Sequence, residues 1–427
     1  MKSFFIMFTG CTRRQLDSER IKNYFVANNC VWCDSQTQAD YIVVTTCGLS
    51  KYLETTSINN IINAKSHNGE VIVFGCLPAM NMAAISDVFE GKIVTTKDIE
   101  RIDEFFPNFN TSFSEISDVN RAFEEPKTSL KQMIKRKIEK LDLYYPLKIY
   151  NIVTEIAKRI AYRRTNGPLT VHSYARRVGN PRLSIDFNNE LFTLRISTGC
   201  LGKCSYCNIK RAIGPLKSKP IWFILDELKK GIASKKFRLN LVASDTGSYG
   251  LDIGATFPQL LDAILVADSR IIIQFIQDLH PKWLYRYKDD LIRIVGTKRI
   301  RSILTAVQSG SERILRLMNR CNHFPEYRRV IDAMKKAYPG LRLRSQVIVG
   351  FPTETEEDLL DTINFIKKCK FDEIDIFHYY ETPTMDSAKI YPKVPEDLIR
   401  ERIVRLYDAL PVSMVKRPHQ VINQRGL

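Results

Sequence analysis

The sequence predicts an α/β protein with three parts: a small N-terminal domain built on an open parallel sheet, a helical insertion, and a partial (β/α)6 TIM-like barrel. Short β-branched and aromatic runs alternate with segments whose apolar residues recur at helical spacing, first over residues 1–100 and again after residue 190. Alternating strands and helices are the order that parallel sheets require. The expected bounds are 1–106, 107–190 and 191–392, followed by a helical tail, 393–427.

In the first domain, three cysteines each follow a strand-like run. The strand-like runs are "KSFFIMF", "YIVVTT", "EVIVFG" and "KIVTT", and helical spacing appears at 18–28 and 55–66. Cys11, Cys47 and Cys76 come just after the first three runs. The carboxyl ends of parallel strands share one edge of a sheet, so we expect these thiols to meet there.

The insertion is strongly basic. From residue 127 to residue 187 it holds 14 Lys/Arg against 4 Asp/Glu, and "RRTNGPLTVHSYARRVGN" is expected to be a basic loop. One interpretation is two amphipathic helices with solvated polar faces, and the other is a surface for an acidic substrate. On the second interpretation the substrate contacts are Arg163, Arg164, Arg176 and Arg177.

The barrel is predicted from six strand-like runs with helical segments between them. These runs are "LFTLRIS", "RLNLVAS", "RIIIQFI", "SILTAVQ", "LRLRSQVIV" and "FDEIDIFHY". Working residues of such barrels lie at the carboxyl ends of the strands. That position is occupied here by Cys200, Asp245, Gln308, Ser309 and Gly350.

Composition restricts the function classes. The formal net charge of +17 favours an anionic partner such as nucleic acid. No run approaches the roughly 18 apolar residues of a membrane span. The first apolar run, around "FFIMF", is shorter than the roughly 7–15 residues of the apolar region of a signal peptide. It also fits a buried strand. We therefore expect a cytoplasmic protein without membrane association, whose ten cysteines serve metal or redox chemistry.

The motif with the most chemical content is the C-x3-C-x2-C run of Cys200, Cys204 and Cys207. A structural zinc site uses four closed ligands, commonly two C-x2-C pairs, and the pair Cys30 and Cys33 lies in the other domain. A [4Fe–4S] cluster is held by thiolates, and three of them leave one iron open for a ligand. The cluster is favoured over zinc.

Seven motifs, in order, resemble those of the methylthiotransferases of the radical S-adenosylmethionine (SAM) superfamily, over about residues 1–390. They are "FTGCTRRQLDSERI", "VVTTCGLSK", "VFGCLPAM", "LRISTGCLGKCSYCNIKRAIGPLKS", "LVASDTGSYGLDIG", "AVQSGSERILRLMNR" and "VIVGFPTETEEDLLDT". Two of them are most similar to the archaeal and eukaryotic branch, which modifies threonylcarbamoyladenosine (t6A) in transfer RNA.

The resemblance implies two [4Fe–4S] clusters and SAM as cofactors. By the family pattern, Cys200, Cys204 and Cys207 hold the SAM-cleaving cluster, and Cys11, Cys47 and Cys76 hold an auxiliary cluster that carries the sulfur. One SAM methylates that sulfur, and a second yields a radical that removes hydrogen from an unactivated C–H bond. Asp245, Gln308, Ser309 and Gly350 are candidate SAM contacts.

The substrate implied by the resemblance is C2 of t6A37 in transfer RNA, and the alternative is a precursor peptide or ribosomal protein. A monomer served by an external one-electron donor is expected. The pattern departs from the family at Ile213, Gln346 and Thr384, which stand where Arg, Asp and Gly are common. The family's C-terminal RNA-binding β-barrel also has no counterpart in the residues after "SAKIYP", and the basic insertion is expected to take over its role. A non-catalytic iron–sulfur scaffold is the third possibility.

Overall fold

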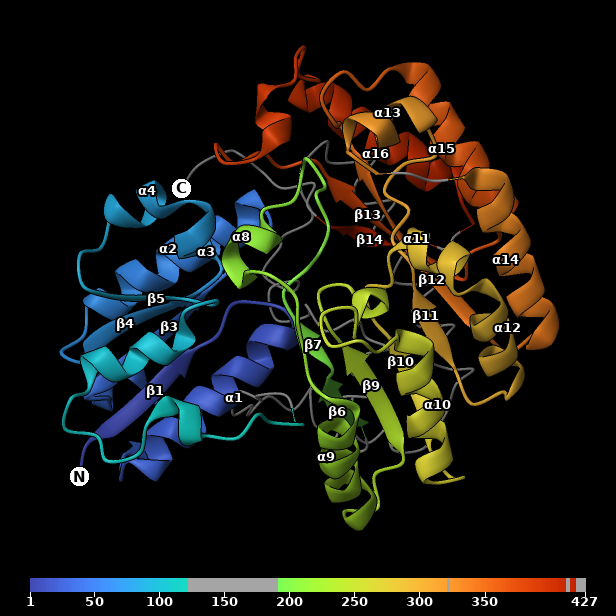
Figure 1. Ribbon diagram of the computed structural model, residues 1–427. Coiled ribbons are helices and arrows are strands. Elements are labelled where there is room, and N and C mark those ends of the chain that lie inside the picture. Colours follow the sequence, from blue (N-terminus) through green and yellow to red (C-terminus); the bar gives the residue numbers. More distant parts are fainter. Residues whose placement is uncertain (122–190, 321–322, 412–414, 420–427) are drawn as a thin grey trace.

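The computed structural model describes residues 1–121, 191–320, 323–411 and 415–419, which form two lobes that lie side by side (Figure 1). The smaller lobe is the N-terminal domain, and the larger one is built around a strongly twisted sheet. Within the described residues, no helix combines the length and apolarity needed to cross a bilayer.

The N-terminal lobe contains a five-stranded parallel sheet in the order β2-β1-β3-β4-β5. Its strands are β1 (Ser3–Met7), β2 (Val31–Trp32), β3 (Tyr41–Thr46), β4 (Glu70–Gly75) and β5 (Lys92–Thr95). The four predicted strands are confirmed. The two-residue β2 is too short to produce a sequence pattern, and its pairing with β1 defines it.

Alternating side chains of this sheet support two cores. Phe4 and Ile6 pack toward one face, and Phe5 and Met7 pack toward the other. The first face is covered by α1 (Thr12–Ala27), η2 (Ile99–Phe105) and η3 (Phe113–Glu115). The second face is covered by α2 (Lys51–Lys65), α3 (Leu77–Met80) and α4 (Met82–Ser86), while η1 (Gln36–Gln38) lies in the loop before β3.

Two boundaries differ from the expected ones. Helix α1 starts at Thr12, six residues before the predicted helix. Its first turn is polar and shows no apolar periodicity in the sequence. The Arg14–Asp17 ion pair (2.7 Å) stabilises this turn instead. Phe113 belongs to the N-terminal core and Ile116 packs against it, so this packed unit extends past the boundary drawn at residue 106.

The large lobe contains a seven-stranded parallel sheet in the order β14-β13-β12-β11-β10-β9-β6. Its strands are β6 (Leu191–Arg195), β9 (Arg238–Val242), β10 (Ile272–Ile276), β11 (Ser302–Leu304), β12 (Arg342–Val349), β13 (Glu373–His378) and β14 (Val415–His419). A two-stranded antiparallel sheet joins β7 (Ser197–Thr198) to β8 (Lys217–Ser218). The six predicted strands are confirmed as a partial barrel.

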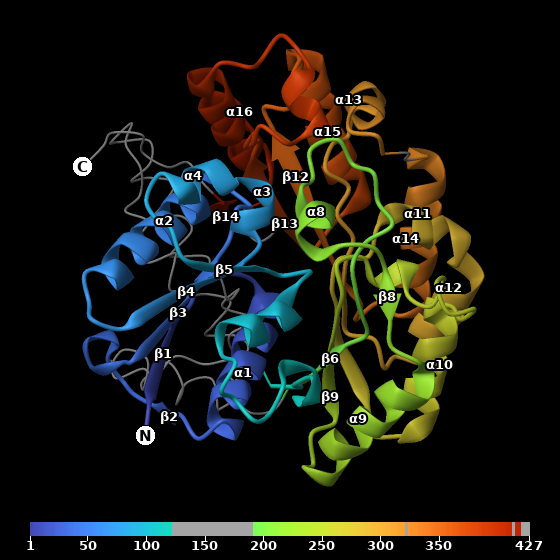
Figure 2. The ribbon, with the colours of Figure 1, turned by 60° about the vertical axis from the view of Figure 1, so that its left-hand side comes forward.

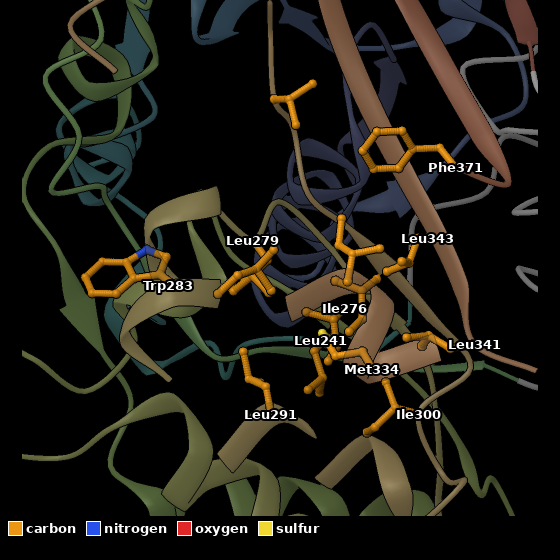
Figure 3. Close-up of a cluster of buried hydrophobic side chains, with 14 of the residues drawn as sticks. Leu241, Ile276, Leu279, Trp283, Leu291, Ile300, Met334, Leu341, Leu343 and Phe371 are labelled. Carbon is orange, nitrogen blue, oxygen red and sulfur yellow. The ribbon is translucent and has the colours of Figure 1, made fainter. Parts of the chain in front are cut away.

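Helices on the convex face bury the main core. They are α9 (Ile221–Ala233), α10 (Phe257–Ala267), α11 (Pro281–Arg286), α12 (Lys288–Gly296), α14 (Phe324–Ala337), α15 (Glu356–Cys369) and α16 (Glu396–Ala409). The shorter elements are α8 (Ile209–Ile213), α13 (Glu312–Leu317), η6 (Thr246–Ser248) and η7 (Asp386–Lys389). Strand residues such as Leu241 and Leu343 meet helix residues such as Leu291 and Met334 in this core (Figure 3). Asn240 on β9 is buried and polar, and its Oδ1 accepts from the side-chain amide of Gln277, the residue that follows β10 (3.2 Å).

The tail was predicted to be helical, which is correct for α16 and wrong for β14. Residues 415–419 pair in parallel with β13 and extend the sheet at its edge. Their sequence, "VKRPH", lacks an alternating apolar pattern and contains a proline. Proline is tolerated on an edge strand, so the strand depends on the partner it pairs with rather than on its own composition.

The two lobes meet through packed helices and buried charges. Helix α3 packs against α8, and the two helices lie beside each other in both views (Figure 2). Asp17 on α1 pairs with Arg195 on β6 at 2.6 Å, and Arg195 also approaches Asp118 at 3.3 Å. Buried charges are costly unless paired, so this chain of opposite charges fixes one arrangement of α1 against the barrel edge.

Candidate functional site

The structure brings Cys11, Cys47 and Cys76 together at one sheet edge. They follow β1, β3 and β4, which are neighbours in the sheet order, so their carboxyl ends lie next to one another. Burial, and then the negative charges of Cys76 and Cys11, raise the pKa of the Cys47 thiol well above its ordinary value. The thiols are therefore close enough to feel each other's charge, as the sequence predicts.

The three thiols have different surroundings. Burial raises the pKa of Cys76, whose Sγ lies 3.5 Å from Thr96 Oγ1. Burial opposes ionisation of Cys11 as well, but the charges of Arg13 and Arg14 outweigh it and lower the pKa of that thiol. The site therefore carries positive charge beside one of the thiols that would become a thiolate ligand.

The second triad lies on the loop between β7 and α8. The small antiparallel pair of β7 and β8 closes the base of this loop. Gly199 there has φ of +75°, and a Cβ at this position would lie 1.8 Å from the carbonyl oxygen of Pro215. Only glycine fits that close approach. Further along, the Gly202 N–H donates to Cys200 Sγ (3.2 Å), which turns the loop around its own sulfur.

The thiols of this loop also interact with one another. Burial raises the pKa of Cys207 to about 12, and the charge of Cys204 adds to the increase. Burial likewise raises the pKa of Cys200. Arg320 lies in the turn after α13, and its guanidinium donates to Cys204 Sγ (3.7 Å) and to the Tyr206 hydroxyl (2.9 Å). Sequence reasoning missed Arg320, since no local spacing links it to the cysteine run.

Each triad offers three thiols, the donor set that holds a [4Fe–4S] cluster with one iron left open. Among the described residues, no three His, Cys, Asp or Glu side chains gather closely enough to hold a single metal ion. Zinc would require its sulfurs within about 2.3 Å of one centre, whereas a cuboidal cluster spreads its thiolates over several iron atoms. The arginines beside each triad complement the negative charge of such a group.

Comparisons with known proteins agree with this arrangement. The profile described as "Radical SAM superfamily" matches residues 194–366, and "Uncharacterized protein family UPF0004" matches residues 3–95. Two similar proteins are a threonylcarbamoyladenosine tRNA methylthiotransferase of Drosophila pseudoobscura pseudoobscura (26% identity, 95% of this chain, 64% of the relative) and a probable one of Pyrococcus horikoshii (27%, 94% and 82%). The chain therefore contains a radical SAM domain and is similar over almost its whole length to tRNA methylthiotransferases.

Two further similarities are informative. The ribosomal protein uS12 methylthiotransferase RimO of Thermosipho melanesiensis is 28% identical, over 95% of this chain and 82% of the relative. The structure of the radical SAM methyltransferase TsrM from Kitasatospora setae, with cobalamin and a [4Fe–4S] cluster bound, matches with a TM-score of 0.55 at 12% identity, covering 90% of this chain and 73% of TsrM. At that identity the match supports the fold alone. The chain spans 64% of the length of the Drosophila relative.

Radical SAM enzymes use SAM and [4Fe–4S] clusters, and Asp245 is the first of the residues predicted to contact SAM. The Asp245 carboxylate is buried and accepts the indole N–H of Trp283 at 2.7 Å and the backbone N–H of His280 at 3.3 Å. Burial raises the pKa of Asp245. Its charge reaches Cys200 across the loop, so Asp245 lies beside the barrel triad with its oxygens already engaged.

Gln308 has the features of a ligand contact. Its side chain is 8% exposed, and its Oε1 has no hydrogen-bond partner among the described residues. Its backbone also adopts φ of +72°, a conformation that costs energy outside glycine. A buried acceptor without a donor is rare in folded proteins. This oxygen therefore fits a ligand that brings an N–H or O–H group to the barrel mouth.

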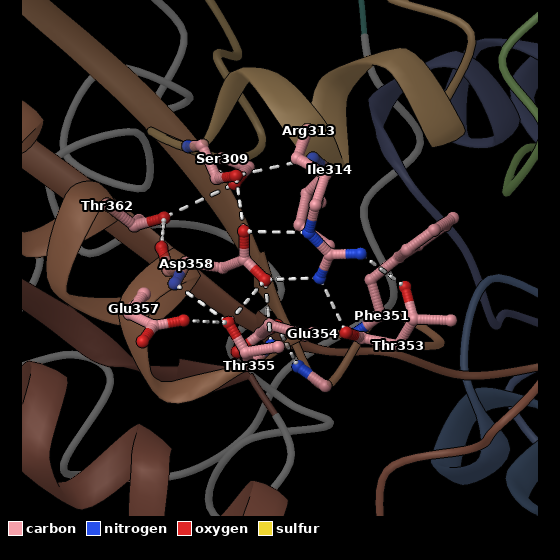
Figure 4. A network of polar contacts seen from close by, with 12 residues as sticks. Ser309, Arg313, Ile314, Phe351, Thr353, Glu354, Thr355, Glu357, Asp358 and Thr362 are labelled. Atoms are coloured by element: carbon pink, nitrogen blue, oxygen red, sulfur yellow. Dashed lines mark hydrogen bonds and ion pairs between the residues drawn. The ribbon is translucent and has the colours of Figure 1, made fainter.

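Ser309 and Gly350 have internal roles in the structure. The Ser309 hydroxyl lies 3.2 Å from Thr362 Oγ1 within the polar network around Asp358 (Figure 4). Gly350 donates its N–H to Glu354 Oε2 at 2.7 Å, and a Cβ at Gly350 would meet the Ile399 side chain. Arg163, Arg164, Arg176 and Arg177 lie outside the described residues.

Thr384, one of the departures from the family pattern, connects the two cysteine-bearing regions. Its Oγ1 donates to the carbonyl of Met80 (3.0 Å), four residues after Cys76. It also accepts from the amide of Asn208 (2.7 Å), the residue after Cys207. One side chain of the barrel lobe thus links the segment after one triad to the segment after the other.

Replacing Arg320 with methionine is expected to weaken the barrel triad. The change removes a buried positive charge beside Cys204 and leaves the Tyr206 hydroxyl without its donor, so the free energy of unfolding should fall by about 2–4 kcal/mol. Without that charge, a reduced cluster is less favoured and its reduction potential should become more negative. Urea titration and potentiometric EPR measure the two effects.

The matched control is Arg316→Met, because Arg316 is an exposed arginine in the last turn of α13, four residues before Arg320. It should leave both values unchanged. An Arg320→Met protein with the wild-type potential would show that this charge does not act on the cluster.

Proposed function

We propose that this chain is a methylthiotransferase that converts an unactivated C–H bond to C–S–CH3 at C2 of t6A37 in transfer RNA. The observation that supports it most strongly is the presence of two cysteine triads, one on each lobe, with linked segments between them. The relatives from Drosophila and Pyrococcus are named for this activity on threonylcarbamoyladenosine.

In this proposal Cys200, Cys204 and Cys207 hold the SAM-cleaving cluster, and the N-terminal triad holds the auxiliary cluster. When bound, the clusters and SAM supply the radical and the sulfur. The residues of the chain bind and orient these groups. Gln308 Oε1 accepts a hydrogen bond from SAM, while Asp245 positions the loop after β9 through Trp283 and His280.

Other residues complete the proposal. Ser309 and Gly350 act indirectly, because their internal contacts hold the loops after β11 and β12 that border the proposed SAM site. The insertion, 107–190, supplies Arg163, Arg164, Arg176 and Arg177 as phosphate contacts, and RNA affinity that rests on them would decrease with salt. Activity on transfer RNA fits a cytoplasmic monomer that receives electrons from an external one-electron donor.

A protein substrate is the second candidate, and the similarity to a uS12 methylthiotransferase favours it. Mass spectrometry separates the two. The chain is reconstituted anaerobically, and its iron is counted, with about eight atoms expected for two clusters. Transfer RNA and proteins from cells that lack the gene are then incubated with the reconstituted chain.

Gain of one methylthio group on the t6A nucleoside supports the proposal. The same mass gain on a peptide or protein, with RNA unchanged, would transfer the mechanism to the second candidate. If the chain forms no 5′-deoxyadenosine from SAM although both clusters are present and reduced, the result would contradict both candidates. It would favour the third possibility, a non-catalytic iron–sulfur scaffold.

A further inference from the structure

Arg13 lies at the junction between the two lobes. It is the second residue of α1, two positions after Cys11. Its Nη1 donates to the carbonyl of Ala243 (2.7 Å) and pairs with Asp278 Oδ2 (2.5 Å). Ala243 follows β9 directly and Asp278 follows β10, so both acceptors lie at the carboxyl edge of the large sheet. Arg13 therefore crosses from one cysteine-bearing lobe to the mouth of the other.

This position is between the two triads. On the N-terminal side, Arg13 lies in the first turn of α1, two residues after Cys11 and beside the sheet edge that also carries Cys47 and Cys76. On the barrel side, Asp245 follows Ala243 by two residues and its charge reaches Cys200. A substrate atom that must meet both the radical and the sulfur has to lie between the triads, and hence near Arg13.

One edge of the guanidinium remains available. Both Nη1 hydrogens are used by Ala243 and Asp278, whereas Nε–H and Nη2–H have no acceptor among the described residues. These atoms are not sealed from solvent, and the side chain is 20% exposed. By contrast, Arg195 in the same interface is 9% exposed and is enclosed between two carboxylates. The Asp278 pair thus holds one end of Arg13 and leaves the other edge open.

The open edge has a defined chemical preference. The Nε–H and Nη2–H groups of arginine are parallel and match the two oxygens of a carboxylate. The t6A nucleoside carries such a carboxylate, on a threonine that a carbonyl group joins to N6. C2 and N6 lie on the same Watson–Crick edge of adenine, so a base that presents C2 between the triads brings its threonyl group into the same space.

We propose that the Nε–Nη2 edge of Arg13 binds the threonyl carboxylate of t6A and so selects the modified base over plain adenosine. The inference rests on the proposed function, because it names how that substrate is recognised. A backbone phosphate is less suited to this position, since Arg13 is mostly buried at the lobe junction rather than on an open surface.

The test uses the reconstituted full-length chain and three anticodon stem-loop RNAs of one sequence, with A, t6A or the methyl ester of t6A at the target position. The ester keeps the size of the threonyl group and removes its charge. Binding is measured by fluorescence anisotropy, and methylthio product by mass spectrometry. The wild type is expected to bind the t6A RNA about 10- to 100-fold more tightly than the ester, the range of a hydrogen-bonded charge pair.

Two variants separate recognition from structure. Arg13→Lys keeps a positive charge for Asp278 but lacks the planar fork, so the preference for acid over ester should disappear while the iron content stays at the wild-type level. Asp278→Asn weakens the ion pair and keeps the fork, so the preference should survive.

A wild type that does not distinguish acid from ester overturns the assignment, as does an Arg13→Lys protein that retains the preference. Equal loss in Asp278→Asn would also overturn it, because the effect would then come from the ion pair. If the wild type methylthiolates the t6A RNA in any of these cases, the proposed function stands and the role of Arg13 alone fails. If it modifies a protein and none of the RNAs, both fail.

Discussion

Replacing Cys204 with alanine is expected to abolish the formation of 5′-deoxyadenosine from SAM. Cys204 is the central thiol of its loop: it interacts with the charges of Cys200 and Cys207 and accepts from Arg320. Two thiolates from so short a loop cannot replace three, so the barrel cluster should be lost. Iron should fall from about eight to about four atoms per chain. Chromatography of the reduced protein incubated with SAM measures the product.

The control for this variant is Cys33→Ala. Cys33 is partly buried outside both triads, and its Sγ donates to the carbonyls of Phe4 and Ser35. This substitution should leave iron content and SAM cleavage unchanged. Continued SAM cleavage by Cys204→Ala would mean that the radical-generating cluster is held elsewhere.

The N-terminal triad could be predicted from the sequence because two local facts sufficed. Cys11, Cys47 and Cys76 each follow a recognisable strand, and consecutive parallel strands place their carboxyl ends on one edge. The sheet order β1-β3-β4 then brings the three together. The barrel triad was simpler still, since its three cysteines lie within eight residues.

The surroundings of the triads could not be predicted in this way. Arg320 meets Cys204 across 116 residues of sequence, and Arg13 meets Asp278 across 265. No sequence spacing predicts either contact, because each one depends on how two lobes or two distant loops pack against each other. The polar ends of the barrel strands show the same limit. Asp245 and Gln308 were found as polar residues at strand ends. Only the structure shows that Asp245 has its oxygens engaged, while Gln308 Oε1 has no donor within the part of the chain that is described.

Replacing Cys47 with alanine is expected to preserve SAM cleavage, the step that Cys204→Ala abolishes, and to stop sulfur transfer. Cys47 is buried among the N-terminal thiols, and its removal leaves that triad with two ligands. The barrel triad belongs to a lobe with its own hydrophobic core, separate from the two cores of the N-terminal lobe. Cleavage of SAM should therefore continue near the wild-type rate, while methylthio product falls to background and iron again falls to about four atoms per chain.

Together, the two variants test which lobe cleaves SAM and which lobe donates the sulfur, and they do so more directly than either variant alone. The measurement is one reaction mixture assayed twice, for 5′-deoxyadenosine and for the methylthio nucleoside. Product at the wild-type level from Cys47→Ala would contradict the assignment of sulfur donation to the N-terminal triad. Loss of both products, with the barrel cluster still present by EPR, would show that SAM cleavage depends on the N-terminal cluster. The lobe contacts made by Arg13 and Thr384 offer a physical route for such dependence.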